Sequence, residues 1–184
     1  MSNSPLSNPA AGAADAGTAA AYTAALLDAL GNREPLAVLA ELPGWMDRRL
    51  EGIRPELLAR PEAPGKWSAL DLLRHLVDTE FVHVYRIRTA LEQDRPSIRG
   101  YDQDAWVRLF PASVPTVADG LELLRAVRGA NLRLWRSLSA DQLARVMLHE
   151  ERGPEPVAHL LRMLAGHDLV HRRQMERIVV SLGS

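Results

Sequence analysis

The chain has 184 residues, of which 47% are hydrophobic and 24% are charged, and its formal net charge is −1 at pH 7. These values are ordinary for one soluble globular domain, and a nearly neutral chain without a basic stripe gives no indication of a nucleic-acid or acidic-membrane partner. The chain contains no cysteine, which excludes disulfides, thiolate metal sites, iron–sulfur clusters and a cysteine nucleophile.

The N-terminal segment Met1–Gly17 is rich in Ala, Ser, Asn, Gly and Pro and has little to bury, so it is predicted to be a disordered tail. It lacks the basic and apolar regions of a secretory signal. No apolar run approaches the length of a transmembrane helix. We therefore expect a cytoplasmic protein with no membrane partner, in which residues 18–184 form a single domain.

The first part of this domain predicts two helices. Apolar residues at helical spacing favour a short helix over 18–30 and a second helix over 35–53. The dipeptide Pro43-Gly44 lies inside the second stretch and is expected to kink or split it. The proline-dense segment 55–65 is then predicted to be a loop.

A third helix is marked by its first residues. Ser68 stands in the N-cap position and Asp71, three residues later, in the capping-box position, so a helix is predicted from there to about Gln93. Residues 94–115 are interrupted by Pro and Gly. They predict a long connection that contains a short helix near residues 102–109.

Two further helices complete the predicted fold. One begins at Thr116 and runs to about Ser137, with an additional turn over 139–144, and the last runs from Pro156 to near Gly183. No stretch shows sustained alternation of apolar and polar residues, so we expect no sheet. The pattern predicts an all-α fold: a four-helix bundle with a long crossover connection, plus an extra short N-terminal helix.

Two histidines one helical turn apart, His167 and His171, are the most informative feature of the sequence. They fall on the apolar stripe of the last helix, so both imidazoles project from the same buried face. His75 lies on the apolar stripe of the third helix and is the natural third ligand for a transition metal. Three neutral ligands with open positions are typical of a catalytic site. The alternative is three core histidines that hydrogen-bond to carbonyls or side chains.

Polar residues on the third helix have two interpretations each. Asp78 or Glu80 could hold the second nitrogen of a ligating histidine, or could lie on an exposed helix face. Arg86 and Arg88 could bind a substrate carboxylate, but pairing with Glu80 or other acids is the favoured interpretation.

The connection over 94–115 carries Tyr101, Asp102, Asp104 and Trp106, and a bundle can place a pocket wall in such a segment. The favoured interpretation is that Trp106 caps the core and that an aspartate caps the short helix. The remaining histidines are interpreted as surface or interhelical residues: His83, His149 and His159.

Several motifs between about Tyr22 and Ile178 together resemble one known family. They are Gly65-Lys66-Trp67-Ser68 opening a helix, Arg74-His75-Leu76-Val77-Asp78-Thr79-Glu80, Arg86-Ile87-Arg88, Asp94-Arg95-Pro96 with Gly100-Tyr101-Asp102 and Trp106, and the closing Gly166-His167, His171 and Gln174. In these motifs the chain is similar to the DinB-like superfamily of metal-binding four-helix bundles, particularly its YfiT-like branch.

That resemblance implies a single divalent metal, most often zinc or nickel, held by three histidines that match His75, His167 and His171 by position. It also implies a small-molecule substrate, a low-molecular-weight thiol as one type of cosubstrate, and a homodimer, which sedimentation would test. Two function classes follow. The chain is either a metal-dependent enzyme, a thiol S-transferase or a hydrolase acting on a small electrophile, or a metal-loaded bundle without catalysis that serves as a stress-related binding or assembly module.

Overall fold

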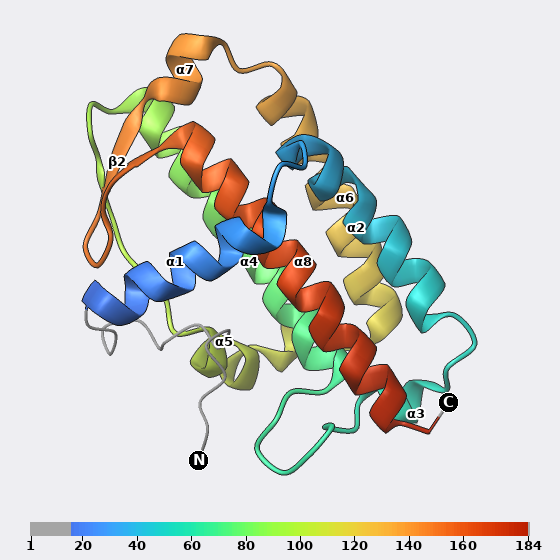
Figure 1. Cartoon of the computed structure of the whole chain (residues 1–184). Coiled ribbons are helices and arrows are strands. Elements are labelled where there is room, and N and C mark those ends of the chain that lie inside the picture. The colour runs from blue at the N-terminus through green and yellow to red at the C-terminus, as the bar shows by residue number, and fades with distance from the viewer. Residues whose placement is uncertain (1–15, 184) are drawn as a thin grey trace.

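Four long helices form the bundle that the sequence predicts. The computed structural model describes residues 16–183 (Figure 1). The long helices are α2 (Pro35–Leu50), α4 (Ala69–Glu92), α6 (Val117–Arg136) and α8 (Val157–Ser181). The shorter elements are α1 (Ala16–Leu30), α3 (Pro55–Leu58), α5 (Gln103–Leu109), α7 (Ala140–Ala144) and the 3-10 helix η1 (Pro111–Ser113). No helix in residues 16–183 is long and apolar enough to cross a membrane.

Helix α4 begins at the capping box that the sequence predicts. The Ser68 hydroxyl accepts a hydrogen bond from the backbone N–H of Asp71 at 3.1 Å, and the Asp71 carboxylate accepts one from the backbone N–H of Ser68 at 3.0 Å. Asp102 caps α5 in a similar way, because its carboxylate accepts from the backbone N–H of Ala105 at 2.9 Å. The predicted aspartate cap of the short helix is therefore confirmed.

The four long helices do not follow one another around the bundle. Helices α2 and α4 each pack against both α6 and α8, so α2 and α4 stand diagonally opposite one another (Figure 1). The connections 51–68 and 137–156 therefore each cross the end of the bundle. Residues 93–116 join the neighbouring helices α4 and α6. Figure 1 shows these residues running from the end of α4 back along the bundle, past α5, to the beginning of α6, so they form a long crossover connection.

A small three-stranded sheet lies at one end of the bundle, and the prediction of no sheet is wrong. Strand β1 (Ser97–Ile98) runs parallel to β2 (Val146–His149), which pairs antiparallel with β3 (Gly153–Pro156). Strands of two to four residues are too short to show alternation in the sequence. They form because connections that meet at one end of the bundle satisfy their backbone groups by pairing.

Helix α1 lies across the outer surface of α8 (Figure 1). Their closest approach is at Gly166, where an added Cβ would lie 2.0 Å from the carbonyl oxygen of Leu26. Because α1 covers this side, residues 163–171 of α8 are buried without interruption. The helix begins at Ala16, inside the tail predicted for 1–17, and residues 1–15 of that prediction lie outside the described residues.

The contact at Gly166 makes a prediction about stability. Gly166→Ala is expected to destabilise the protein by about 2 kcal/mol or more, because a methyl group would force the α1 backbone away from α8. Gly129→Ala is the matched control in α6, where an added Cβ meets no atom closer than 3.9 Å. Helix propensity alone should make this control neutral or more stable by up to about 1 kcal/mol. Urea unfolding of both variants tests this, and equal stabilities would contradict it.

Candidate metal centre

Three histidines from two helices converge inside the bundle. His75 comes from α4 and His167 and His171 come from α8, and all three side chains are buried. The Nε2 atom of His75 lies 3.0 Å from that of His167 and 3.2 Å from that of His171, and the two α8 nitrogens are 3.0 Å apart. The structure therefore brings together the three residues that the sequence proposes as ligands.

The spacing of these nitrogens fits a bound transition metal. Zn–N bonds of about 2.1 Å at angles between octahedral and tetrahedral place neighbouring nitrogens roughly 3.0–3.4 Å apart. All three observed separations fall within this interval. Three imidazole nitrogens that point at one another at this distance cannot all be satisfied by hydrogen bonds among themselves. The donor set therefore suits one ion with open coordination positions.

Only one of the three Nδ1 atoms of the triad has a hydrogen-bond partner in the described chain. His171 Nδ1–H donates a hydrogen bond to Gln174 Oε1 at 2.8 Å, which directs the Nε2 lone pair toward the other two histidines. The Nδ1 atoms of His75 and His167 have no partner among residues 16–183. Neither Asp78 nor Glu80 bonds to a histidine of the triad in the described chain, so that one of their two interpretations is wrong. For Glu80 the other one is wrong as well, because its side chain is buried.

Burial keeps the triad in the form that binds metals. Desolvation lowers the pKa of His75 and of His167 well below the usual value, and the neighbouring histidines lower it further. Burial likewise lowers the pKa of His171 to about 4. Neutral imidazoles are therefore available at neutral pH without the proton competition that weakens metal binding.

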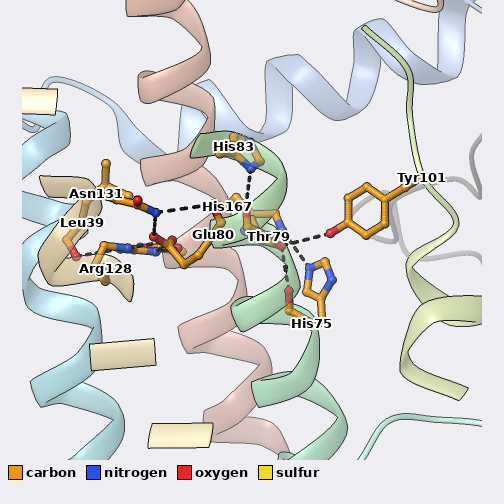
Figure 2. A network of polar contacts seen from close by, with 10 residues as sticks. Leu39, His75, Thr79, Glu80, His83, Tyr101, Arg128, Asn131 and His167 are labelled. Carbon is orange, nitrogen blue, oxygen red and sulfur yellow. Dashed lines mark hydrogen bonds and ion pairs between the residues drawn. The ribbon is translucent and has the colours of Figure 1, made fainter. Parts of the chain in front are cut away.

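A cavity of about 60 Å³ opens beside two of the three histidines. Its wall includes His75 and His167, and it continues along α4 past Thr79 to His83 and Arg86. His83 Nδ1–H donates to the carbonyl oxygen of Thr79 at 2.8 Å (Figure 2). The interpretation of His83 as a surface or interhelical residue missed this position, although the spacing from His75 through Thr79 to His83 is that of one helix face.

Tyr101 separates this cavity from an outer groove. Its hydroxyl lies 3.1 Å from Thr79 Oγ1 (Figure 2). The ring also packs against Trp106 in a tilted arrangement, with the ring centroids 4.6 Å apart. The groove has a volume of about 450 Å³ and is lined by α4 and the connection that follows it. Trp106 therefore forms a groove wall, and the interpretation that it caps the core is wrong.

The other two histidines lie away from the triad. His149 belongs to β2 and is buried, and its Nδ1 accepts a hydrogen bond from the backbone N–H of Glu151 at 3.2 Å. It was expected in a loop as a surface or interhelical residue, and its strand position was not foreseen. His159 is half-buried at the beginning of α8, as expected for a residue outside the site.

A buried ion-pair network lies next to the triad and was not predicted. Arg128 of α6 donates to Glu80 Oε1 of α4 at 2.8 Å (Figure 2). It also donates to Asp168 Oδ2 of α8 at 2.6 Å. Asn131, one turn further along α6, donates to the second Glu80 oxygen at 2.9 Å. Burial alone would lower the pKa of Arg128, but the two carboxylates outweigh that effect and raise it. The guanidinium therefore stays charged.

The same arginine satisfies a backbone group that a proline leaves open. Pro43 has no N–H to donate to the carbonyl of Leu39, four residues earlier in α2. That carbonyl accepts a hydrogen bond from Arg128 Nη1 at 2.7 Å instead. Helix α2 continues through Pro43 without interruption, so the predicted split is absent.

The sequence did contain a signal for this network. Leu124, Arg128 and Leu132 occupy one stripe of α6, so a charged residue stands where an apolar one is normal. Such a residue requires buried partners of opposite charge. Their identity could not be read from the sequence, because Glu80 and Asp168 are 48 and 40 residues away from Arg128.

The fold and the site together define a four-helix bundle with a buried three-histidine centre. The chain belongs to the DinB superfamily, whose family model matches residues 39–175. The structure is similar to that of YfiT from Bacillus subtilis, with a TM-score of 0.74 at 24% identity over 81% of this chain and 86% of that one. That structure is described as an unusual four-helix bundle topology, so the predicted family and fold are confirmed.

Two sequence relatives carry names that describe candidate metal-dependent hydrolases. YfiT of Bacillus subtilis is 28% identical over 116 residues, which is 63% of this chain and 65% of that protein. The match therefore spans slightly less than two thirds of the YfiT sequence. OB0782 of Oceanobacillus iheyensis is 24% identical over 133 residues, which is 72% of this chain and 77% of that protein.

The buried network generates a prediction about stability. Arg128→Met is expected to destabilise the protein by about 3–5 kcal/mol, because it leaves two buried carboxylates without a cation. Arg125→Met is the matched control on the same helix, since Arg125 pairs with Asp47 at the surface, where its side chain is 56% exposed. This control should cost less than about 1 kcal/mol. Chemical unfolding compares the two variants, and a similar small loss in both would show that the network contributes little.

Proposed function

We propose that the chain is a metal-dependent enzyme that binds one divalent transition metal through the Nε2 atoms of His75, His167 and His171 and acts on a small electrophilic substrate. The convergence of three neutral imidazole nitrogens, 3.0–3.2 Å apart at the wall of a cavity, carries this proposal. The relatives named as candidate metal-dependent hydrolases support it.

The ligands narrow the choice of metal without fixing it. Three imidazoles and no thiolate favour zinc, nickel, iron or manganese over metals that require soft sulfur ligands. Zinc and nickel are the first candidates, because both accept a three-histidine face and fill their remaining positions with water or substrate. A divalent ion bound there would supply a Lewis acid that lowers the pKa of water or a thiol and polarises a carbonyl.

The cavity residues indicate that the attacking group comes from outside the chain. The hydroxyl groups on the cavity wall belong to Tyr22, Thr79 and Tyr101. Thr79 donates its proton to the backbone carbonyl of His75 at 2.8 Å. Burial raises the pKa of Tyr101 to about 12 and also raises that of Tyr22, so both phenols stay protonated at neutral pH. None of these three groups is an activated nucleophile, which leaves water or a small thiol for that role.

Two side chains on the wall are suited to orienting a substrate. Because the Thr79 proton is already donated to a carbonyl, the Tyr101 hydroxyl donates to Thr79 Oγ1 and keeps its own oxygen as an acceptor. His83 uses Nδ1–H for the Thr79 carbonyl, so its Nε2 is also an acceptor. Burial, and next the nearby charge of Arg86, lower the pKa of His83 to about 3, which keeps this ring neutral.

Water as the nucleophile makes the chain a hydrolase, and a thiol makes it an S-transferase. In the first case the water oxygen joins the electrophilic carbon, and the leaving group departs with a proton. In the second case the thiol sulfur takes the place of that oxygen. The hydrolase is the first to test because of the relatives' names. The thiol cosubstrate, the homodimer and the cytoplasmic location stay predictions.

The metal proposal is tested by elemental analysis of protein purified without a histidine tag or chelator. About one equivalent of a transition metal is expected in the wild type, and almost none in His75→Ala or His171→Ala, because two imidazoles alone bind the ion weakly. His159→Ala, which lies outside the site, should keep the full equivalent. Metal at a hundredfold excess over its Kd should also stabilise the wild type by about 2.7 kcal/mol. Wild type that cannot be loaded would contradict the proposal.

Catalysis is tested separately with 4-nitrophenyl acetate and with 1-chloro-2,4-dinitrobenzene plus cysteine as the thiol. The loaded wild type is expected to exceed the metal-depleted protein by at least about a hundredfold in one assay, because a bound ion activates the nucleophile and stabilises developing charge. His159→Ala should match the wild type. If protein loaded with a full equivalent of metal reacts no faster than the metal-depleted protein, the result would support the non-catalytic binding module instead.

A further inference from the structure

Two arginines in residues 16–183 are more than nine-tenths buried, and their partners differ. Arg128 is 1% exposed and forms ion pairs with Glu80 and Asp168. Arg86 is 6% exposed and forms no ion pair with a carboxylate in the described chain. Its hydrogen-bond partner in the described chain is a backbone group, the carbonyl oxygen of Arg99, which accepts from Nη2. The favoured interpretation of the sequence, in which Arg86 pairs with Glu80 or another acid, is therefore wrong within the described chain.

No carboxylate of the described chain forms an ion pair with Arg86, although the more distant Glu151 and Glu155 partly offset its charge. Burying a cation without an opposite charge is costly, so such groups normally have a partner. Burial, and next the neighbouring Arg152, lower the pKa of Arg86 to about 10, so it remains protonated at neutral pH. Of the two nearby carboxylates, Glu155 is paired directly with Arg152 at 2.9 Å, and Glu151 lies in the wall of the same cavity as Arg86.

Arg86 forms part of the wall of both the cavity and the outer groove. It lines the cavity that contains His75 and His167, and it also lines the outer groove beyond Tyr101. Its Nε and Nη1 atoms have no hydrogen-bond partner in the described chain, yet they are not among the polar atoms that the protein encloses completely. Donors of a charged guanidinium therefore face space that a ligand can enter.

We infer that the substrate carries a carboxylate and that Arg86 binds it. This inference rests on the proposed function, because it names the substrate class of the same site. A guanidinium presents two parallel N–H donors that match the two oxygens of one carboxylate. One guanidinium without a direct ion pair fits a singly charged anion better than a phosphate dianion, which would bring a second negative charge near Glu151 and Glu155.

The position of Arg86 also restricts the shape of the substrate. Arg86 follows His75 by about three turns of α4, which corresponds to roughly 16 Å along the helix axis. The arginine side chain points back toward the N-terminus of the helix and shortens this separation by several ångströms. The carboxylate is therefore remote from the reacting bond, and the substrate is an acid whose electrophilic group lies several bonds away.

The experiment measures binding of butyrate and of its neutral analogue butyramide at constant ionic strength by isothermal titration calorimetry. The proteins are metal-loaded wild type, Arg86→Gln, Arg86→Lys and the control Arg88→Gln, whose side chain is exposed on the same helix. The wild type should prefer butyrate. Arg86→Gln should lose about tenfold or more in butyrate affinity, because a charge-assisted hydrogen bond is removed, and its butyramide affinity should be unchanged. Arg86→Lys should keep part of the preference, and Arg88→Gln all of it.

Two results would overturn the inference. One is an unchanged butyrate affinity in Arg86→Gln, or in Arg86→Lys if the glutamine variant does not fold. The other is a butyrate preference that disappears from the wild type when metal is removed, since the carboxylate would then be bound by the ion. Metal content is measured in every sample. A protein without metal contradicts the proposed function, whereas butyrate titrations of the same metal-free wild type and of Arg86→Gln still decide the role of Arg86.

Discussion

The ion pair between Arg128 and its two carboxylates determines how the helices of this bundle face one another. It joins α6 to Glu80 of α4 and to Asp168 of α8, and it reaches α2 through the carbonyl of Leu39. Such a network adds little net stability over a well-packed apolar core, but a misaligned helix would leave a buried charge unpaired. Asp168 directly follows His167 and Glu80 directly follows Thr79, so the rotation that satisfies Arg128 also turns the metal-binding faces of α4 and α8 toward each other.

This polar layer lies between two apolar clusters, one of which includes Leu72, Leu76 and Ile178 and the other Leu39, Ile87 and Leu160. Burial of these apolar side chains offsets the cost of burying polar atoms without partners beside the network, which include the Nδ1 atoms of His75 and His167. Helix α1 closes the outer side of the layer because Gly166 allows its backbone to approach. Enclosure removes water from the three histidines and keeps them neutral. Burial of these polar rings therefore costs stability but leaves their Nε2 lone pairs available to a metal.

Sequence reasoning succeeded where the signal is local. The Ser68 and Asp71 cap depends on residues three apart, and the histidine pair of α8 depends on residues four apart, so both follow from helix geometry. Reasoning failed where a residue's role depends on a distant partner. The sequence leaves Glu80 open between a histidine partner and an exposed helix face, because its actual partner, Arg128, is 48 residues away. Pro43 predicts a kink or a split of its helix, because the sequence does not show that the same arginine satisfies the carbonyl that Pro43 leaves open. The three-stranded sheet forms only because β1, from the connection 93–116, meets β2 and β3 of the connection 137–156.

The same dependence on partners separates the two buried arginines. The carboxylates of Arg128 belong to the chain, so folding itself neutralises that charge and the result is structural order. No carboxylate of the described chain forms an ion pair with Arg86, so the folded protein keeps guanidinium donors that an anionic ligand can engage on binding. The interaction between Arg86 and an anion then contributes to ligand binding instead of to folding. Unsatisfied groups at functional sites commonly lower the stability of a protein and raise its affinity for a ligand in this way.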